Sequence, residues 1–210
     1  MGVIIKKNVA VDCLLGIWNI EEDFDTLFSK VNLTPAEIET LSGFLSYQRK
    51  LEWLSVRVLM NELAEKDCRI IYNEQHKPFL ADNSHNISIS HSKNLTSILI
   101  SKNKRVGLDL EFMSHQIDNI ARKFINEKEV ITTDPELKRL HLYIHWCAKE
   151  ALYKICDKQD INFKQNLTIK PFKIQYEGAL EGLVDNRLGH EHFDMSYFLI
   201  DGYIVVWCSK

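Results

Sequence analysis

Apolar side chains recur at helical spacing in two long segments, which predicts one helix over residues 48–64 and another over residues 135–156. The second helix has a clear beginning, because Asp134 is a good N-cap and Pro135 suits the first helical position. Its apolar side chains fall on one face, so we expect this face to pack against a core. The stripe comprises Leu137, Leu140, Ile144, Cys147, Ala151 and Ile155.

Two shorter helices and several strands complete the pattern. A helix is predicted from Pro35, because Thr34 and Glu37 can form a capping box around its first turn. Helical spacing returns around residues 117–124. Elsewhere apolar and polar residues alternate or form short apolar runs, which favours strands. The predicted strands cover residues 69–72, 87–90, 95–100 and 106–111, and the region 167–208 is strand-like throughout.

The order of these elements predicts an α+β fold made of two similar lobes. Trp53 and Arg57 on the first long helix have counterparts at the same spacing on the second, Trp146 and Glu150, although two unrelated helices would often match as well. Strands with alternating polarity follow each helix. We therefore expect two similar α+β lobes with a boundary near residue 104. The expected bounds are 1–104 for the N-terminal α+β lobe and 105–210 for the C-terminal α+β lobe, which carries the metal site.

The composition is that of an ordinary globular protein, with 45% apolar and 26% charged residues and a net charge of −3. This charge argues against binding of nucleic acid or a membrane surface through bulk electrostatics. Apolar runs are only a few residues long and no signal segment is evident, so we expect no membrane span and no export. The five cysteines are scattered without a C-x-x-C pair, which favours a reducing cytoplasm.

The most informative motif is a strand that carries Asp109 and Glu111 on one face, within reach of a single hard cation. Gly107 on the same face would leave room for a bulky phosphate. On the second long helix, Glu150 and Lys154 lie one turn apart and could add a third carboxylate and a cation. A solvated strand face and a surface ion pair would give the same two patterns, so each motif alone leaves both interpretations open.

A third motif ends a predicted strand with Ser90 and His91, and a turn just upstream holds Lys77 and Pro78. No G-x-S-x-G elbow surrounds the serine, which argues against a serine hydrolase. A histidine at a strand end suits phosphate binding, although a single histidine is more often structural. The lysine would add a cation held in place by the following proline.

Together these motifs resemble the 4'-phosphopantetheinyl transferase superfamily, in its larger single-chain type, the kind that activates surfactin synthetase. The resemblance lies in the order of four motifs: Lys-Pro, Ser-His-Ser, Gly-x-Asp-x-Glu and Trp-x-x-Lys-Glu-Ala-x-x-Lys. It extends from about Arg49 to Lys154, half of the chain.

The resemblance implies an enzyme, a holo-[acyl-carrier-protein] synthase, that moves 4'-phosphopantetheine from coenzyme A to a serine of an apo acyl or peptidyl carrier protein. The implied reaction depends on Mg²⁺ and releases adenosine 3',5'-bisphosphate, in fatty-acid or secondary-metabolite biosynthesis. The resemblance also implies a fold of two α+β lobes related by a pseudo-twofold axis, with the active site and coenzyme A in the cleft between them. We expect a cytoplasmic monomer whose partners are coenzyme A and the carrier protein, with no nucleic acid and no membrane.

The resemblance also assigns residues. Asp109, Glu111 and Glu150 match the Mg²⁺ ligands, and Lys154 matches a lysine that contacts the coenzyme A phosphates and assists catalysis. The general base is either Glu129, in the family's F-x-x-x-x-E segment, or Glu150, which we favour because it would sit at the metal. The implied coenzyme A contacts are Ser90 and His91 at a phosphate, Lys77 and Pro78 at the adenosine end, and Arg49 and Arg57 near the 3'-phosphate.

One departure and two alternatives qualify this interpretation. The family usually has glycine directly before Lys-Pro, where this chain has His76, so the turn is expected to differ. A non-catalytic module that binds coenzyme A or a carrier protein is the first alternative, and the complete set of three carboxylates argues against it. A magnesium-dependent nucleotide phosphohydrolase is the second, but the chain lacks a G-x-x-x-x-G-K-[ST] phosphate loop.

Overall fold

The computed structural model describes residues 2–114, 117–156, 161–187 and 189–210. It has a mixed α+β architecture, which confirms the predicted fold class. The chain divides into two compact units, Met1–Asn103 and Lys104–Lys210. None of the described helices combines the length and the apolar character needed to cross a membrane.

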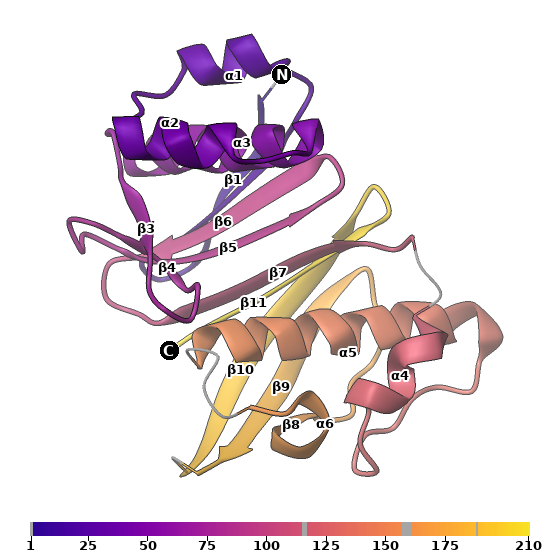
Figure 1. Cartoon of the computed structure of the whole chain (residues 1–210). Coiled ribbons are helices and arrows are strands. Elements are labelled where there is room, and N and C mark those ends of the chain that lie inside the picture. Colours follow the sequence, from indigo (N-terminus) through magenta and orange to yellow (C-terminus); the bar gives the residue numbers. More distant parts are fainter. Residues whose placement is uncertain (1, 115–116, 157–160, 188) are drawn as a thin grey trace. The chain divides into compact units, whose positions relative to one another are not determined.

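The first unit packs helices on an antiparallel sheet with strand order β1-β2-β6-β5, beside a small β3-β4 pair (Figure 1). The long helix α3 contacts β2 and β6, and α1 contacts α3. The capping box predicted at Thr34 and Glu37 is present at the start of α2. The elements are β1 (Gly2–Ala10), β2 (Cys13–Asn19), α1 (Phe24–Ser29), α2 (Pro35–Ser42), α3 (Tyr47–Ala64), β3 (Ile70–Tyr72), β4 (Pro78–Leu80), β5 (Asn86–Ser92) and β6 (Leu95–Ser101).

The hairpin of β1 and β2, which precedes every element predicted from the sequence, was not expected. Strand β1 lies at the sheet edge and is mostly exposed, so its residues show no apolar face. Strand β2 is paired on both sides and largely buried, so its sequence is an apolar run without alternation. Periodicity alone does not distinguish such a run from a piece of buried helix.

The second unit packs the long helix α5 against an antiparallel sheet with strand order β7-β11-β10-β9-β8 (Figure 1). Helix α5 contacts every strand of this sheet, and the short helices α4 and α6 pack against each other. The elements are β7 (Val106–Phe112), α4 (Asp118–Phe124), α5 (Pro135–Ile155), α6 (Phe163–Asn166), β8 (Leu167–Ile169), β9 (Glu177–Asn186), β10 (Gly189–Ile200) and β11 (Tyr203–Ser209).

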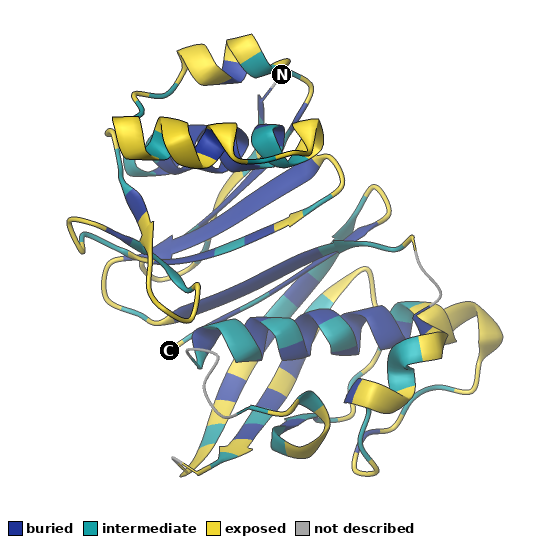
Figure 2. Cartoon of the chain, viewed as in Figure 1, coloured by how far each residue is buried: buried dark blue, intermediate teal, exposed yellow. Residues whose placement is uncertain are grey.

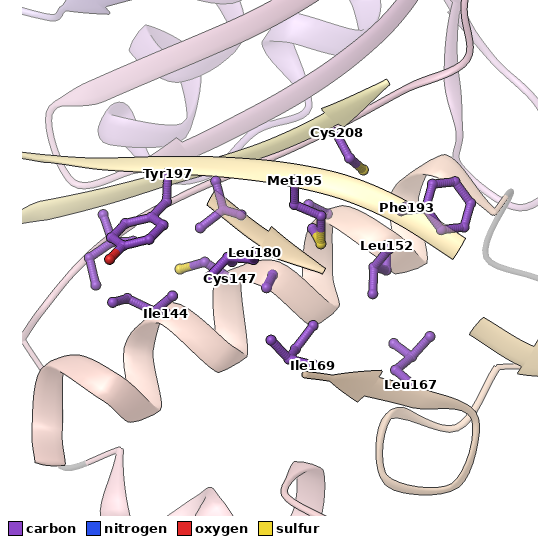
Figure 3. Close-up of a cluster of buried hydrophobic side chains, with 14 of the residues drawn as sticks. Ile144, Cys147, Leu152, Leu167, Ile169, Leu180, Phe193, Met195, Tyr197 and Cys208 are labelled. Carbon is purple, nitrogen blue, oxygen red and sulfur yellow. The ribbon is translucent and has the colours of Figure 1, made fainter. Parts of the chain in front are cut away.

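The apolar stripe of α5 forms the core of the second unit, as its periodicity predicts. Figure 3 shows Ile144 and Cys147 of this helix facing Met195 and Tyr197 of β10. The alternating burial of β9 and β10 follows from the same packing, because one face of each strand meets the core (Figure 2). The stripe does not extend to the first turn of the helix, where Leu137 is 40% exposed.

Gly107 lies where β7 meets α5, and the contact leaves no space for a side chain. A Cβ atom built on this glycine would lie 2.2 Å from the carbonyl oxygen of Ala151 and 3.0 Å from Cβ of Ile155. The expectation that Gly107 leaves room for a phosphate is therefore wrong. The missing side chain instead lets the helix backbone approach the strand.

We predict that Gly107→Ala lowers the free energy of unfolding by about 1–3 kcal/mol, because the added methyl group must displace the backbone of α5. Gly43→Ala is the matched control: Gly43 has a φ of −71°, and the nearest atom to an added Cβ is 3.4 Å away. This control is expected to change stability by less than about 1 kcal/mol, in the stabilising direction. Urea denaturation of both variants checks the prediction, and equal midpoints would contradict the close contact.

Candidate active site

The second unit brings together two residues from separate motifs, Asp109 on β7 and Lys154 on α5. The Lys154 Nζ atom lies 2.8 Å from Oδ1 of Asp109 and donates a second hydrogen bond to the carbonyl oxygen of Leu108, at 2.9 Å. Asp109 is buried and Lys154 is partly exposed. The ion pair therefore holds a carboxylate and an ammonium group together where the helix crosses the strand.

The thiol of Cys147 shows that Glu111 shares this environment. Burial raises the pKa of Cys147 well above its usual value, and the negative charges of Asp109 and Glu111 raise it further. The ammonium group of Lys154 opposes them. Both carboxylates of the strand motif are thus close enough to act on one point of α5. Cys147 itself is a neutral core side chain, which the sequence analysis placed in the apolar stripe.

Glu150 lies one turn before Lys154 on α5, and it lines a cavity of about 530 Å³. The wall is aromatic: the ring of Trp146 lies 5.2 Å from that of Phe124 and 5.6 Å from that of Phe163. The ring of Tyr153 packs at a tilt against the same ring of Phe163, with 5.3 Å between their centres. A mostly apolar wall with a carboxylate at one side suits a flexible organic chain that carries a polar end.

The predicted metal ligands come from two elements, Asp109 and Glu111 from β7 and Glu150 from α5. Within the ranges that the structure describes, no three side chains of histidine, cysteine, aspartate or glutamate come together as one ion-binding group. The chemistry of the donors nevertheless fits Mg²⁺, which prefers carboxylate oxygens. The charge fits as well: Asp109, Glu111 and Glu150 against Lys154 leave two negative charges, which would repel a diphosphate unless a divalent cation balances them.

Glu129 is fully buried, and its partners leave it little freedom. Its Oε2 atom accepts hydrogen bonds from Nζ of Lys149, at 2.7 Å, and from the backbone of Asn126, at 2.9 Å. Its Oε1 atom accepts one from the backbone of Ile169, at 2.9 Å. Sequence reasoning gave Lys149 no role, although it occupies the lysine position just before the glutamate of the Trp-x-x-Lys-Glu motif.

In the first unit, the structure brings Arg49 of α3 to His91 of β5. Nη1 of Arg49 lies 2.7 Å from Nε2 of His91, and Nδ1 of His91 lies 3.4 Å from Oε2 of Glu52. Arginine only donates, so Nε2 must accept and the ring proton sits on Nδ1, facing the carboxylate. Glu52 also pairs with Arg49, at 3.2 Å, and was not singled out from the sequence. Ser90, the preceding residue on β5, is buried.

The turn before Lys77 shows why glycine suits the position of His76. His76 has a φ of +57°, a left-handed conformation that glycine adopts without steric cost. The side chain of Asn73 organises this turn by accepting hydrogen bonds from the backbone of Gln75 and Lys77, at 3.1 and 2.8 Å. The left-handed turn is thus formed although a histidine replaces the expected glycine, and Lys77 and Pro78 follow directly.

Arg57 does not lie at the surface with Arg49. Its side chain is 5% exposed, its guanidinium carbon lies 3.1 Å from the centre of the Trp53 ring, and Nη1 donates to the carbonyl oxygen of Trp53 at 3.2 Å. Glu37 accepts from its Nε atom at 3.4 Å. Burial lowers the pKa of Arg57, which the negative charge of Glu37 opposes. The structure thus places the Arg57 side chain inside the first unit, and its contact with the 3'-phosphate stays a prediction.

Comparison with known proteins gives matches of one kind. The sequence model of the 4'-phosphopantetheinyl transferase superfamily matches residues 105–208, about half of the chain. The 4'-phosphopantetheinyl transferase AcpT of Salmonella typhi is 28% identical over 112 residues, which are 50% of this chain and 58% of that protein. AcpT of Salmonella typhimurium matches to the same extent. The 4'-phosphopantetheinyl transferase HetI of a Nostoc species is 26% identical over 92 residues, 40% of this chain and 39% of that protein.

These matches cover only part of each relative. The aligned part of the chain spans about half the length of the curated relatives it matches. The region that matches the superfamily contains β7 and α5, and therefore Asp109, Glu111, Glu150 and Lys154. The contacts described above thus lie in the part of the chain that resembles known proteins.

Outside the motif positions, α5 buries two histidines, His141 and His145, against Phe172. Nδ1 of His141 accepts from the backbone of Thr132 at 3.1 Å, and Nδ1 of His145 lies 3.0 Å from the carbonyl oxygen of His141. Within the described part of the chain, Nε2 of each ring is buried without a hydrogen-bond partner. Burial lowers the pKa of His141 and lowers that of His145 to about 3, helped by the positive charge of Lys149.

We predict that acid destabilises the second unit through His145. An unfolded histidine titrates near pH 6.5. Between that pH and about 3, His145 is protonated in the unfolded chain but neutral in the folded chain. Each unit by which the pH falls in this range therefore removes about 1.4 kcal/mol from the free energy of unfolding. Above pH 6.5 His145 is neutral in both the folded and the unfolded chain, so it no longer makes stability depend on pH. Urea denaturation between pH 4 and 8 checks this prediction. In His145→Phe the free energy of unfolding should fall less steeply as the pH is lowered. The control is His190→Phe at an exposed position, which should keep the wild-type pH dependence.

Proposed function

Because the chain belongs to the 4'-phosphopantetheinyl transferase superfamily, we propose that it transfers the 4'-phosphopantetheine arm of coenzyme A to a serine of an apo carrier protein. The observation that carries the proposal is the contact of Lys154 with Asp109, in the same unit as Glu111 and Glu150. The serine oxygen would bond to the phosphorus on the pantetheine side of the diphosphate. Adenosine 3',5'-bisphosphate would leave, and the serine proton would pass to a base of the protein.

We propose that Asp109, Glu111 and Glu150 hold Mg²⁺. The ion, when bound, would neutralise the diphosphate and the charge that develops on the leaving group. Lys154 has three N–H donors and stands beside this carboxylate set, so it is placed to bind a phosphate oxygen as a point charge. Its ion pair with Asp109 orients the ammonium group before coenzyme A arrives.

Glu150 is the better of the two proposed bases. It is partly exposed at the aromatic cavity, where a serine hydroxyl has access to it. Glu129 has no exposed side-chain surface, and both of its oxygens already accept hydrogen bonds from the protein. A general base must come within hydrogen-bond reach of the proton it removes. We therefore assign the proton of the carrier serine to Glu150.

The aromatic cavity suits the pantetheine arm, a flexible chain with amide groups and a terminal thiol. Trp146, Tyr153 and Phe163 supply apolar surface, and Asn162 and Glu150 add polar groups to the same wall. In the first unit, Arg49 and His91 are proposed to bind a phosphate of coenzyme A. Lys77 and Pro78 would approach its adenosine end, and Ser90 a phosphate. The two similar lobes expected from the sequence remain part of this proposal.

The carrier protein is the proposed partner, and a cytoplasmic monomer the proposed state. Arg122 and Lys123 lie in the last turn of helix α4, and Lys128 follows the helix by four residues; all three are exposed. The resemblance implies a carrier that is acidic around its modified serine, so this basic group of side chains suits a docking surface by charge. Lys123 also lines the aromatic cavity, which places the group next to the proposed pantetheine site.

The proposed reaction predicts a defined mass gain. Incubated with coenzyme A and Mg²⁺, the protein should add one phosphopantetheine to the serine of at least one apo acyl or peptidyl carrier protein, and a chelator should prevent it. Asp109→Ala should lower the rate by roughly a hundredfold or more, because it removes both a proposed metal ligand and the partner of Lys154. Intact-mass spectrometry of the carrier measures both effects.

The control for this experiment is Asp185→Ala, which removes an exposed carboxylate of β9 in the same unit and should keep full activity. Near-normal transfer by Asp109→Ala would refute the metal assignment. Coenzyme A that binds without any transfer, on every carrier tried, would favour the non-catalytic binding module. Phosphate released from nucleotides would favour a phosphohydrolase.

For the docking surface, we predict that reversing two exposed charges, Arg122→Glu with Lys128→Glu, raises the KM for the carrier protein by about tenfold. The KM for coenzyme A should stay unchanged, because neither residue lines the aromatic cavity. The pair Lys173→Glu with Arg187→Glu makes the same change in net charge at other exposed positions and is the control. An unaltered KM for the carrier in the first pair would exclude this surface.

A further inference from the structure

The interior of the second unit contains a buried charge, the ammonium group of Lys149, whose side chain is 0% exposed. Its Nζ atom donates to Oε2 of Glu129 at 2.7 Å, to the carbonyl oxygen of Phe124 at 2.5 Å and to that of Phe163 at 3.1 Å. An ammonium group has three N–H donors, so these acceptors use all of them. Lys149 therefore has no donor left for a phosphate, although it lies next to Glu150 in the motif.

The carboxylate of Glu129 extends the same network. Beyond Lys149, it accepts hydrogen bonds from the backbone of Asn126, which follows α4, and from the backbone of Ile169 on β8. The ion pair thus links α5 to three other segments: the end of α4 with the turn after it, the start of α6, and β8. Burial lowers the pKa of Lys149, and the adjacent carboxylate opposes that shift.

Two of the linked segments form the wall of the aromatic cavity. Phe124 and Phe163, whose carbonyl oxygens accept from Lys149, both line that cavity, and their rings pack on Trp146. Trp146 precedes Lys149 by about one turn of α5, and Glu150 follows it directly. Displacing the ammonium group would release both phenylalanine segments at once, together with the packing around Trp146.

From this arrangement we propose that Lys149 and Glu129 are positioning residues: their buried ion pair fixes the walls of the aromatic cavity and the orientation of Glu150. Neither residue touches the reacting atoms. The consequence for catalysis rests on the proposed transfer function, whereas the consequence for structure does not. Glu129 accordingly acts through Lys149 and not as the general base.

A buried ion pair gives this proposal a characteristic signature. Removing one partner leaves an uncompensated charge in the interior and is strongly destabilising, whereas removing both charges is much better tolerated. Glu129→Gln should therefore have opposite effects in two backgrounds. In the wild-type protein it leaves Lys149 charged without its counter-ion, but in a Lys149→Met background it removes the remaining isolated charge.

The experiment is a double-mutant cycle of Lys149→Met and Glu129→Gln on the full chain. Each single substitution should lower the melting temperature by roughly 10 °C, and Glu129→Gln should raise it again in the Lys149→Met background. In transfer kinetics with coenzyme A, each single substitution should lower kcat/KM by roughly ten- to a hundredfold. The kcat/KM of the double variant should exceed that of the Lys149→Met variant, because the cavity walls of the double variant lie closer to their native positions.

A spectroscopic readout separates positioning from general destabilisation. The chain has four tryptophans, so fluorotryptophan labelling should give four ¹⁹F resonances, with that of Trp146 assigned by Trp146→Phe. Lys149→Met should shift the Trp146 resonance, because the Trp146 ring contacts Phe124 and Phe163, whose backbone Lys149 holds. The resonances of Trp18 and Trp53 in the first unit should stay unchanged. The control cycle is Lys170→Met with Glu181→Gln, an exposed ion pair of the same unit that should show additive and small effects.

Additive effects of the two substitutions on stability would overturn the proposal, as would an unshifted Trp146 resonance. If Glu129→Gln abolishes transfer in both backgrounds while stability shows the sign reversal, Glu129 is a base and the catalytic part of the proposal falls. Lys149→Gln, which keeps a donor for the carbonyl oxygens, replaces Lys149→Met in the cycle if the latter does not fold. A wild-type protein without transfer activity would refute the proposed function alone, because stability and the ¹⁹F spectrum still test the ion pair.

Discussion

The close approach of β7 to α5 determines where the residues of the candidate site meet. At Gly107 the carbonyl oxygen of Ala151 lies where a side chain would begin, so the strand and the helix touch through backbone atoms. Asp109 lies two residues further along the same strand face, and Lys154 follows Ala151 by three residues on the helix. Their 2.8 Å contact is therefore a consequence of the backbone contact. A larger residue at position 107 would move Asp109 away from Lys154, although residue 107 itself contributes no functional group to the site.

Helix α5 serves the core and the site with different flanks of the same three turns. Cys147 and Ala151 face the sheet, where their small side chains permit the close packing. Lys154 points toward Asp109, and Glu150 lines the aromatic cavity. Successive residues of a helix are 100° apart, so a motif of nine residues can supply core, ion pair and cavity wall together. Its dense composition of small, aromatic and charged residues reflects these separate environments.

Local patterns predicted the helices and most strands because their signals are short-ranged. Thr34 and Glu37 cap a helix by contacts within one turn, and such contacts can be predicted from the sequence. Partners distant in the sequence determine the rest. Glu129 is a candidate base in the sequence, and its ion pair with Lys149 is visible only in the structure. Arg57 is a candidate phosphate ligand in the sequence, and its packing on Trp53 is likewise visible only in the structure. The sequence does not show whether an ionisable residue lies in a core or in a site, and only its burial in the structure distinguishes the two cases.

The two lysines of the Trp-x-x-Lys-Glu-Ala-x-x-Lys motif make this distinction concrete. Lys149 gives all three of its N–H groups to protein acceptors in the interior, and its charge is balanced there by Glu129. Lys154 is partly exposed and is bound to a carboxylate that belongs to the candidate metal set. A phosphate can compete with Asp109 for Lys154, but no phosphate can reach Lys149 without opening the core. Under the two proposals, one lysine would maintain the shape of the substrate cavity, and the other would meet the substrate's charge.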